Sequence, residues 1–159
     1  MEKNRTNAQS SALLLFLISA MILSQFMNVL ATPEFIFWFL ETHQAPFAPD
    51  PGFFVVFSIT LLWVYAFAGW RMWCYNKFTL NSRELLLYLL LLSLMIISVI
   101  FKSSMQAIEV AFIIQILTWF ICLATVKSFL DTDKVAGMLM ILVLLWISFE
   151  TYLYAFLMI

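Results

Sequence analysis

The chain has 159 residues, of which 65% are hydrophobic and 11% are charged, and its mean hydropathy is +1.02. This balance lies far outside that of a soluble globular domain and indicates a protein whose solvent is the lipid bilayer. The formal net charge of −1 gives no basic excess with which to neutralise phosphates, so nucleic acid is excluded as a partner.

Charged residues divide the sequence into five almost uncharged stretches, each long enough to cross a membrane. About 20 helical residues span the ~30 Å hydrocarbon layer, because each residue adds about 1.5 Å. The stretches are continuously apolar and lack the alternation of a barrel strand, so the predicted fold class is an all-α membrane protein with a five-helix transmembrane bundle. We predict a single integral membrane domain over 1–159, with helices at about 11–31, 53–75, 84–102, 106–130 and 135–158.

The first predicted helix follows Lys3 and Arg5, a pattern that also fits a cleavable signal peptide. Its apolar run is longer than the ~7–15 residues of a typical signal core, so we expect a retained helix.

The first loop, 32–52, contains all four prolines of the chain. Between the first two prolines lies a short aromatic stretch at 34–40, which predicts a short helix that is entered and left by turns. This helix could be a lid over the mouth of the bundle or an anchor in the headgroup layer, and both interpretations remain open.

The basic residues gather on one side of the predicted topology. With five helices, the amino terminus shares its side with the loops at 75–84 and 130–135, and Lys102 alone of the basic residues falls on the other side. The positive-inside rule therefore predicts a multi-pass protein with a cytoplasmic amino terminus. The basic residues on that side are Lys3, Arg5, Arg71, Lys77, Arg83, Lys127 and Lys134.

Glu150 is the residue of the last predicted helix that most needs an explanation. An ionised carboxylate within the membrane costs on the order of 3 kcal/mol, so other groups must compensate it. Trp146, Glu150 and Tyr154 share one helical face, which predicts a ligand-binding wall. The alternative is that Glu150 bonds to Gln115, Thr118 or Tyr154 and locks the helices together.

The cysteines and the histidine give no support for a metal site. Cys74, Cys122 and His43 lie apart and without ligand spacing, so we interpret the thiols as small packing residues. Gln115, Thr118 and Cys122 form a stripe that we interpret as helix-packing contacts. Trp63 and Trp119, taken alone, are typical of core or lipid-facing aromatic residues.

A weak sterol-type pattern, L-x-x-Y-x5-R, is present at Leu62, Tyr65 and Arg71. Such patterns often match by chance, and the carboxyl end of the chain carries no basic residue that could form a second one.

Several motifs from Trp38 onward occur in a characteristic order. They are Trp38-Phe39, Ala45-Pro46 and Pro49-Asp50-Pro51-Gly52 in the first loop, Ala124-Thr125-Val126 then Phe129 followed by Val135-Ala136-Gly137 later on, and Trp146-Ile147-Ser148-Phe149-Glu150-Thr151-Tyr152-Leu153-Tyr154 near the end. This order resembles the TspO/MBR family, whose last helix ends W-x-x-F-x-T-x-L-N. The chain departs from the family in its third helix, where Leu91-Leu92-Ser93-Leu94-Met95 replaces a Q-L-x-L-N run, and at Ile59, where a Trp is expected.

The resemblance implies a five-helix bundle, often a homodimer, with an aromatic-lined cavity that opens toward the first loop. Members of the family bind tetrapyrroles such as protoporphyrin IX and haem, and some bind sterols or promote light-dependent porphyrin breakdown. The resemblance thus implies a tetrapyrrole as ligand rather than a required cofactor, with membrane lipids as surroundings. The candidate ligand-binding residues are Trp38, Phe39, Pro49, Trp63, Met95, Ser98, Gln115, Thr118, Trp146, Phe149, Glu150 and Tyr154.

No nucleophile, base and orienting group stand together in the sequence, so hydrolytic or transferase chemistry has no support. Three hypotheses follow. The first is a binding protein for a tetrapyrrole or another hydrophobic small molecule such as a sterol, acting in sensing, transport or porphyrin breakdown. The second is a proton-coupled transporter of a small solute that uses Glu150, and the third is a structural small subunit of a membrane complex.

Overall fold

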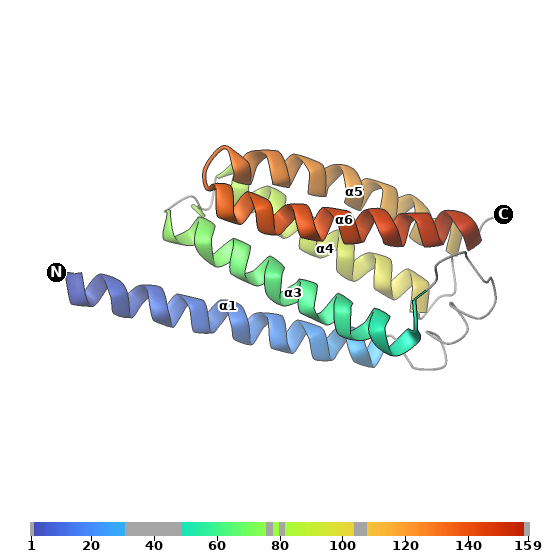
Figure 1. Ribbon diagram of the computed structural model, residues 1–159, viewed down its shortest axis with the longest axis horizontal. Coiled ribbons are helices and arrows are strands. Elements are labelled where there is room, and N and C mark those ends of the chain that lie inside the picture. Colours follow the sequence, from blue (N-terminus) through green and yellow to red (C-terminus); the bar gives the residue numbers. More distant parts are fainter. Residues whose placement is uncertain (1, 31–48, 76–77, 80–81, 104–107, 158–159) are drawn as a thin grey trace.

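The computed structural model describes residues 2–30, 49–75, 78–79, 82–103 and 108–157 (Figure 1). Within these residues the chain forms five helices and no strand, and all five helices are long and apolar enough to cross a membrane. The predicted all-α five-helix membrane fold is confirmed. The expected short helix at 34–40 lies outside the described residues. The helices are α1 (Glu2–Leu30), α3 (Pro51–Cys74), α4 (Arg83–Ser103), α5 (Ile108–Leu130) and α6 (Lys134–Leu157).

Helix α1 begins at Glu2, well before the predicted start at 11. The apolar stretch that could cross the membrane starts only at Gln9. Charge and hydropathy patterns detect the part of a helix that lies in lipid, whereas Glu, Lys, Arg, Gln and Ala can continue the same helix into water. The first turns of α1 are therefore a polar extension of a transmembrane helix.

Helix α3 starts at a well-defined cap. The Asp50 carboxylate accepts hydrogen bonds from the backbone N–H groups of Gly52 and Phe53, at 2.9 and 3.3 Å. Pro51 occupies the first turn, where its missing N–H is no loss. The cap ends the proline-containing loop and begins the helix at Pro51.

Helix α6 also starts at an aspartate cap, and this one is tied to a second helix. Asp133 accepts hydrogen bonds from the backbone N–H groups of Val135 and Ala136, at 3.3 and 3.1 Å. Its carboxylate also accepts from Nε and Nη2 of Arg71, near the end of α3, at 2.5 and 3.1 Å. One side chain thus fixes the α5–α6 turn and joins it to α3.

The helices form a closed ring in the order α1, α3, α6, α5 and α4, in which each packs mainly against two neighbours. Contact is most extensive between α5 and α6 and between α4 and α5, and it is lightest between α1 and α4. Gly137 permits the close approach at the α5–α6 turn, because a Cβ there would lie 2.8 Å from Cα of Leu130. The ring therefore has one tightly packed side and one light seam, which lies between α1 and α4.

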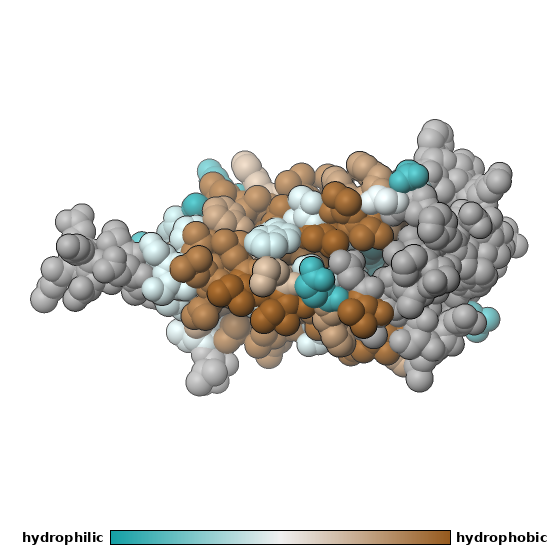
Figure 2. All heavy atoms as spheres, turned by 90° about the horizontal axis from the view of Figure 1, so that it is seen from below, coloured by the Kyte–Doolittle hydropathy of each residue, from teal (hydrophilic) through white to brown (hydrophobic). Residues whose placement is uncertain are grey.

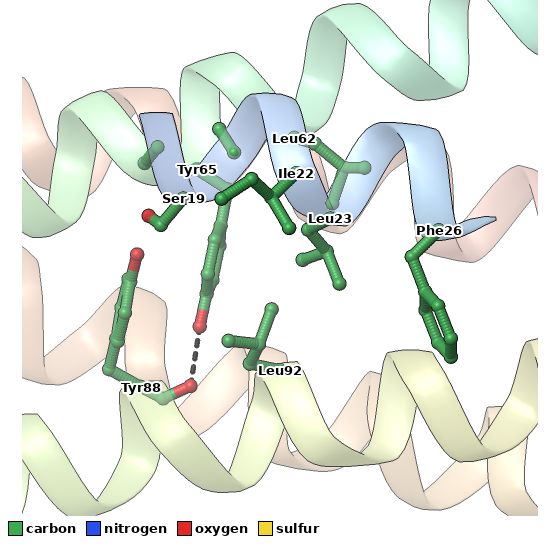
Figure 3. Close-up of a pocket in the computed structure, with 10 residues that line it drawn as sticks. Ser19, Ile22, Leu23, Phe26, Leu62, Tyr65, Tyr88 and Leu92 are labelled. Atoms are coloured by element: carbon green, nitrogen blue, oxygen red, sulfur yellow. Dashed lines mark hydrogen bonds between the residues drawn. The ribbon is translucent and has the colours of Figure 1, made fainter. Parts of the chain in front are cut away.

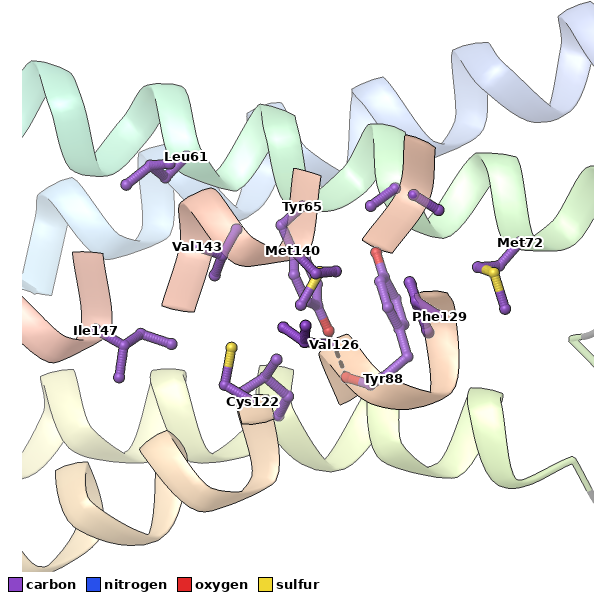
Figure 4. Packing of buried hydrophobic residues seen from close by; sticks show 13 residues of the cluster. Leu61, Tyr65, Met72, Tyr88, Cys122, Val126, Phe129, Met140, Val143 and Ile147 are labelled. Atoms are coloured by element: carbon purple, nitrogen blue, oxygen red, sulfur yellow. Dashed lines mark hydrogen bonds between the residues drawn. The ribbon is translucent and has the colours of Figure 1, made fainter. Parts of the chain in front are cut away.

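The main buried core lies between α3, α4, α5 and α6 (Figure 4). The rings of Tyr65 and Tyr88 stack within it, with centroids 4.3 Å apart and planes at 9°. The Tyr65 hydroxyl donates a hydrogen bond to the backbone carbonyl of Tyr88. Helix α1 reaches this core through Phe16, which is only partly buried. The four later helices supply most of the described packing.

Much of the described outer surface is apolar. Figure 2 shows apolar side chains covering most of the middle of one face, with a small hydrophilic patch among them and residues of intermediate hydropathy toward the end at which α1 begins. Leu15 and Val56 are 68% and 65% exposed. Large apolar side chains on the outside of long helices are stable where the surroundings are acyl chains, so the described surface fits a bilayer.

Candidate functional site

Three of the candidate residues form a hydrogen-bonded chain across three helices. The Ser98 hydroxyl on α4 donates to Oε1 of Gln115 on α5, at 3.1 Å. The Gln115 amide Nε2 then donates to Oε2 of Glu150 on α6, at 3.2 Å. Ser98 and Gln115 are each only 3% exposed, and Glu150 is half-buried. Both bonds join different helices, so the chain supplies hydrogen-bond partners to polar side chains on α4, α5 and α6.

Trp146 lies in an aromatic cluster one turn before Glu150. Its ring centroid is 5.1 Å from Phe54 and 4.7 Å from Phe57, both on α3, and 5.4 Å from Phe149 on its own helix. Tyr154 belongs to the same cluster and is 1% exposed. Trp146 and Tyr154 therefore pack against other side chains of the bundle.

The remaining candidates are dispersed. Thr118 is fully buried and donates to the backbone carbonyl of Ile114 on its own helix, at 2.7 Å. Met95 packs against the edge of the main core, and Pro49 and Trp63 are half-buried. Trp38 and Phe39 lie outside the described residues. The structure thus groups Ser98, Gln115 and Glu150 by hydrogen bonds, and Trp146, Phe149 and Tyr154 by packing.

A cavity of about 380 Å³ lies elsewhere, between α1, α3 and α4 (Figure 3). Its buried residues, which we call the floor, include the stacked Tyr65 and Tyr88. Its exposed residues, which we call the mouth, all come from α1. The floor is Ala20, Leu62, Tyr65, Ala66 and Tyr88, the mouth is Ser19, Ile22 and Phe26, and Leu23 and Leu92 lie between them.

The lining of this cavity is apolar and uncharged, with three hydroxyl groups. Two of these already donate within the chain, since Ser19 bonds to the backbone carbonyl of Phe16 at 2.7 Å and Tyr65 bonds to that of Tyr88. In Figure 3 the hydroxyls of Ser19 and Tyr88 lie at the same end of the cavity. Ligand pockets are commonly of ~300–1,000 Å³, mostly apolar, with a few polar groups that orient the ligand, and this cavity fits that description.

The cavity-lining residues were not among the candidates from the sequence. Tyr88 interrupts a leucine run, and Leu62 and Tyr65 form part of the weak sterol-type pattern. The third member of that pattern, Arg71, is bonded to Asp133 and does not line the cavity. A tyrosine in the middle of an apolar transmembrane stretch is the signal that could have identified the floor.

In the described part of the chain, no three His, Cys, Asp or Glu residues are grouped so that they could hold a metal ion. Cys122 is fully buried in the main core, as expected of a packing residue, and Cys74 is half-buried. What the arrangement offers is an apolar cavity, an aromatic cluster and one buried polar chain.

A family model described as the TspO/MBR family matches residues 11–159, which is nearly the whole chain. No curated protein matches the sequence.

Proposed function

The chain belongs to the TspO/MBR family, and from that premise we propose that it binds a flat hydrophobic ligand of the tetrapyrrole type inside its helix bundle. Protoporphyrin IX and haem are the first ligands to test, followed by sterols. Sensing, transport and light-dependent porphyrin breakdown all begin with this binding step. Membrane lipids and a second copy of this chain are the partners that we expect around it.

The observation that carries the proposal is the cavity between α1, α3 and α4. Its apolar lining suits the body of a macrocycle, and the ring of Tyr65 gives its floor a flat aromatic surface. The aromatic cluster around Trp146 and the carboxylate of Glu150 form a second candidate surface on α6. The experiment must therefore separate the cavity from this surface.

Binding can be followed by quenching of tryptophan fluorescence when protoporphyrin IX is added to the protein in lipid nanodiscs. Ala20 is buried in the floor, and Ala20→Phe fills part of the cavity, so we expect at least tenfold weaker binding. Met21→Phe is the matched control. Met21 is next to Ala20 in the sequence, but its side chain is 48% exposed and does not line the cavity. Equal affinity in the two variants, with both folded, would remove the cavity as the site.

A second pair of variants tests the surface on α6. If Trp146→Phe and Glu150→Gln weaken binding while Ala20→Phe does not, the ligand lies against α6. If Ala20→Phe weakens binding while the two α6 variants do not, the ligand lies in the cavity.

The hydrogen-bonded chain favours a second candidate function, proton-coupled transport of a small solute. Ser98, Gln115 and Glu150 join three helices and end at a carboxyl group, and carboxyl groups within membrane helices often belong to proton relays. Uptake into proteoliposomes that requires a pH gradient and is lost in Glu150→Gln would support it. Uptake unaffected by that substitution would exclude Glu150 as the relay.

A further inference from the structure

The proposed ligand site has no charged group in its lining and opens toward lipid. Resting on the proposed function, we propose that the cavity takes uncharged ligands sideways from the bilayer, through the seam between α1 and α4. The site would then select a neutral lipophile over the same molecule carrying carboxylates.

The first observation is the chemistry of the lining. None of the ten lining residues is Asp, Glu, Lys, Arg or His. A macrocycle with two propionates would have no cation from this lining to pair with. Holding an ionised carboxylate in such surroundings is unfavourable, so an acidic ligand must be protonated or must leave its carboxylates outside the cavity.

The second observation is the direction in which the cavity opens. Ile22 and Phe26, at the mouth, are 62% and 46% exposed, whereas the floor is buried. These two residues lie within 9–26 on α1, and the lining residues of α3 and α4 lie within 52–74 and 83–101, all stretches long and apolar enough to cross a membrane. A mouth at this depth faces acyl chains.

The third observation is how α1 is held. Near its start, the Trp70 indole N–H donates to the backbone carbonyl of Gln9 at 3.0 Å, and Phe16 packs edge-on against Tyr88 with centroids 6.4 Å apart. Beyond Phe16, the hydroxyls of Ser19 and Ser24 donate to carbonyls of α1 itself. Contact between α1 and α4 is the lightest in the ring, so the mouth lies where the bundle parts most easily.

The test compares mesoporphyrin, a dicarboxylic acid, with its dimethyl ester, which has the same macrocycle and no charge. Both are titrated at pH 7.5 into the full chain in nanodiscs of neutral phospholipid. Empty nanodiscs give the correction for partition into lipid, and Ala20→Phe shows how much binding belongs to the cavity. We expect the ester to bind at least tenfold more tightly than the acid.

Equal or tighter binding of the acid, with loss in Ala20→Phe, would overturn charge selection while keeping the proposed site. If neither porphyrin bound, the proposed function itself would fail, and this inference with it.

Entry through the seam between α1 and α4 can be tested by the rate of ligand uptake. Ile22→Trp places bulk at the mouth, and we expect several-fold slower uptake of the ester from preloaded donor vesicles. Met21→Trp, one position along the same helix, should leave the rate unchanged. Equal rates in these two variants would overturn access through the seam.

Discussion

Gln115 shows how a single amide can make a carboxyl group tolerable between membrane helices. Its side-chain carbonyl accepts a hydrogen bond from Ser98 and its side-chain N–H donates one to Glu150, so both ends of the amide are hydrogen-bonded. Each bond joins different helices, whereas most serine and threonine hydroxyls in these helices donate to their own backbone. The chain of three residues is therefore a lateral link between α4, α5 and α6.

Ser98→Ala removes the first bond of this chain and leaves the buried Oε1 of Gln115 without that donor. We expect a loss of about 1 kcal/mol in the free energy of unfolding, in line with interhelical hydrogen bonds in other membrane proteins. Ser93→Ala on the same helix is the control, because Ser93 is exposed and donates to the carbonyl of Leu89. Unfolding in mixed micelles measures both variants, and an equal loss would contradict the special role of Ser98.

Tyr65 combines two roles that substitutions can separate. Tyr65→Phe keeps the ring stacked on Tyr88 and removes the hydroxyl bond to the Tyr88 carbonyl. We expect about 1 kcal/mol lower stability with porphyrin affinity largely kept. Tyr65→Leu also removes the aromatic surface of the floor and should weaken binding at least tenfold. Fluorescence quenching compares them, and equal affinities would show that the ring does not contact the ligand.

Among the elements, the start of α6 depends most on one residue. Asp133 caps the helix and pairs with Arg71, and this guanidinium together with the backbone N–H groups of Ala136 and Val135 lowers the pKa of the Asp133 carboxyl. A lowered pKa in the folded state stabilises the fold above the ordinary Asp pKa of about 3.9, and this contribution is lost as the pH falls through the folded pKa.

Asp133→Asn should keep an oxygen for the cap but lose the ionic bond, whereas Asp133→Ala loses both. We expect losses of roughly 1 and 2 kcal/mol at pH 7. The difference between wild type and Asp133→Asn should begin to shrink below about pH 4, because the carboxyl of the unfolded chain then takes up a proton, and it should disappear once the pH has fallen through the lowered pKa of the folded protein. Thermal unfolding in detergent at pH 7 and pH 3.5 measures this, and a difference independent of pH would contradict the ionic contribution.

The helices were largely predictable, because water-free surroundings require every backbone group to be bonded within its own helix. The prediction found five apolar stretches, and it missed the polar first turns of α1 because Glu2 and its neighbours look like a solvated tail. The need for a partner for Glu150 was also predictable from the cost of a carboxylate in lipid, and the bond from Gln115 is present.

The cavity was not predictable in the same way. It is formed by α1, α3 and α4, and helical periodicity shows which residues share a face but not which helices become neighbours. Tyr65 and Tyr88 are 23 positions apart and meet only because α3 and α4 pack together around the main core. The shared face of the aromatic residues on α6, by contrast, was predictable because their spacing along a single helix determines it.

At the scale of the whole molecule, the charges of the two ends predict an orientation. Arg83, Lys127 and Lys134 lie at the end of the bundle where α1 begins, whereas Asp50 and Glu109 lie at the opposite end. The positive-inside rule predicts that the first end lies in the cytoplasm. The homodimer implied by the family remains a prediction.

Labelling of single cysteines in intact bacterial cells tests the orientation. In a background of Cys74→Ser and Cys122→Ser, Asp50→Cys should react with a membrane-impermeant maleimide from outside. Lys134→Cys, which is also at an exposed position, should react only after the cells are permeabilised. The reversed pattern would invert the topology.

The division between a core made by four helices and a cavity completed by a fifth affects how such a protein can change over generations. Substitutions on the cavity-facing side of α1 alter what the molecule accommodates, yet they touch few of the side chains that keep it folded. Ligand preference could thus diverge through one peripheral helix while the remainder stays constant. Related chains with similar cores could then differ widely in the molecules that they hold.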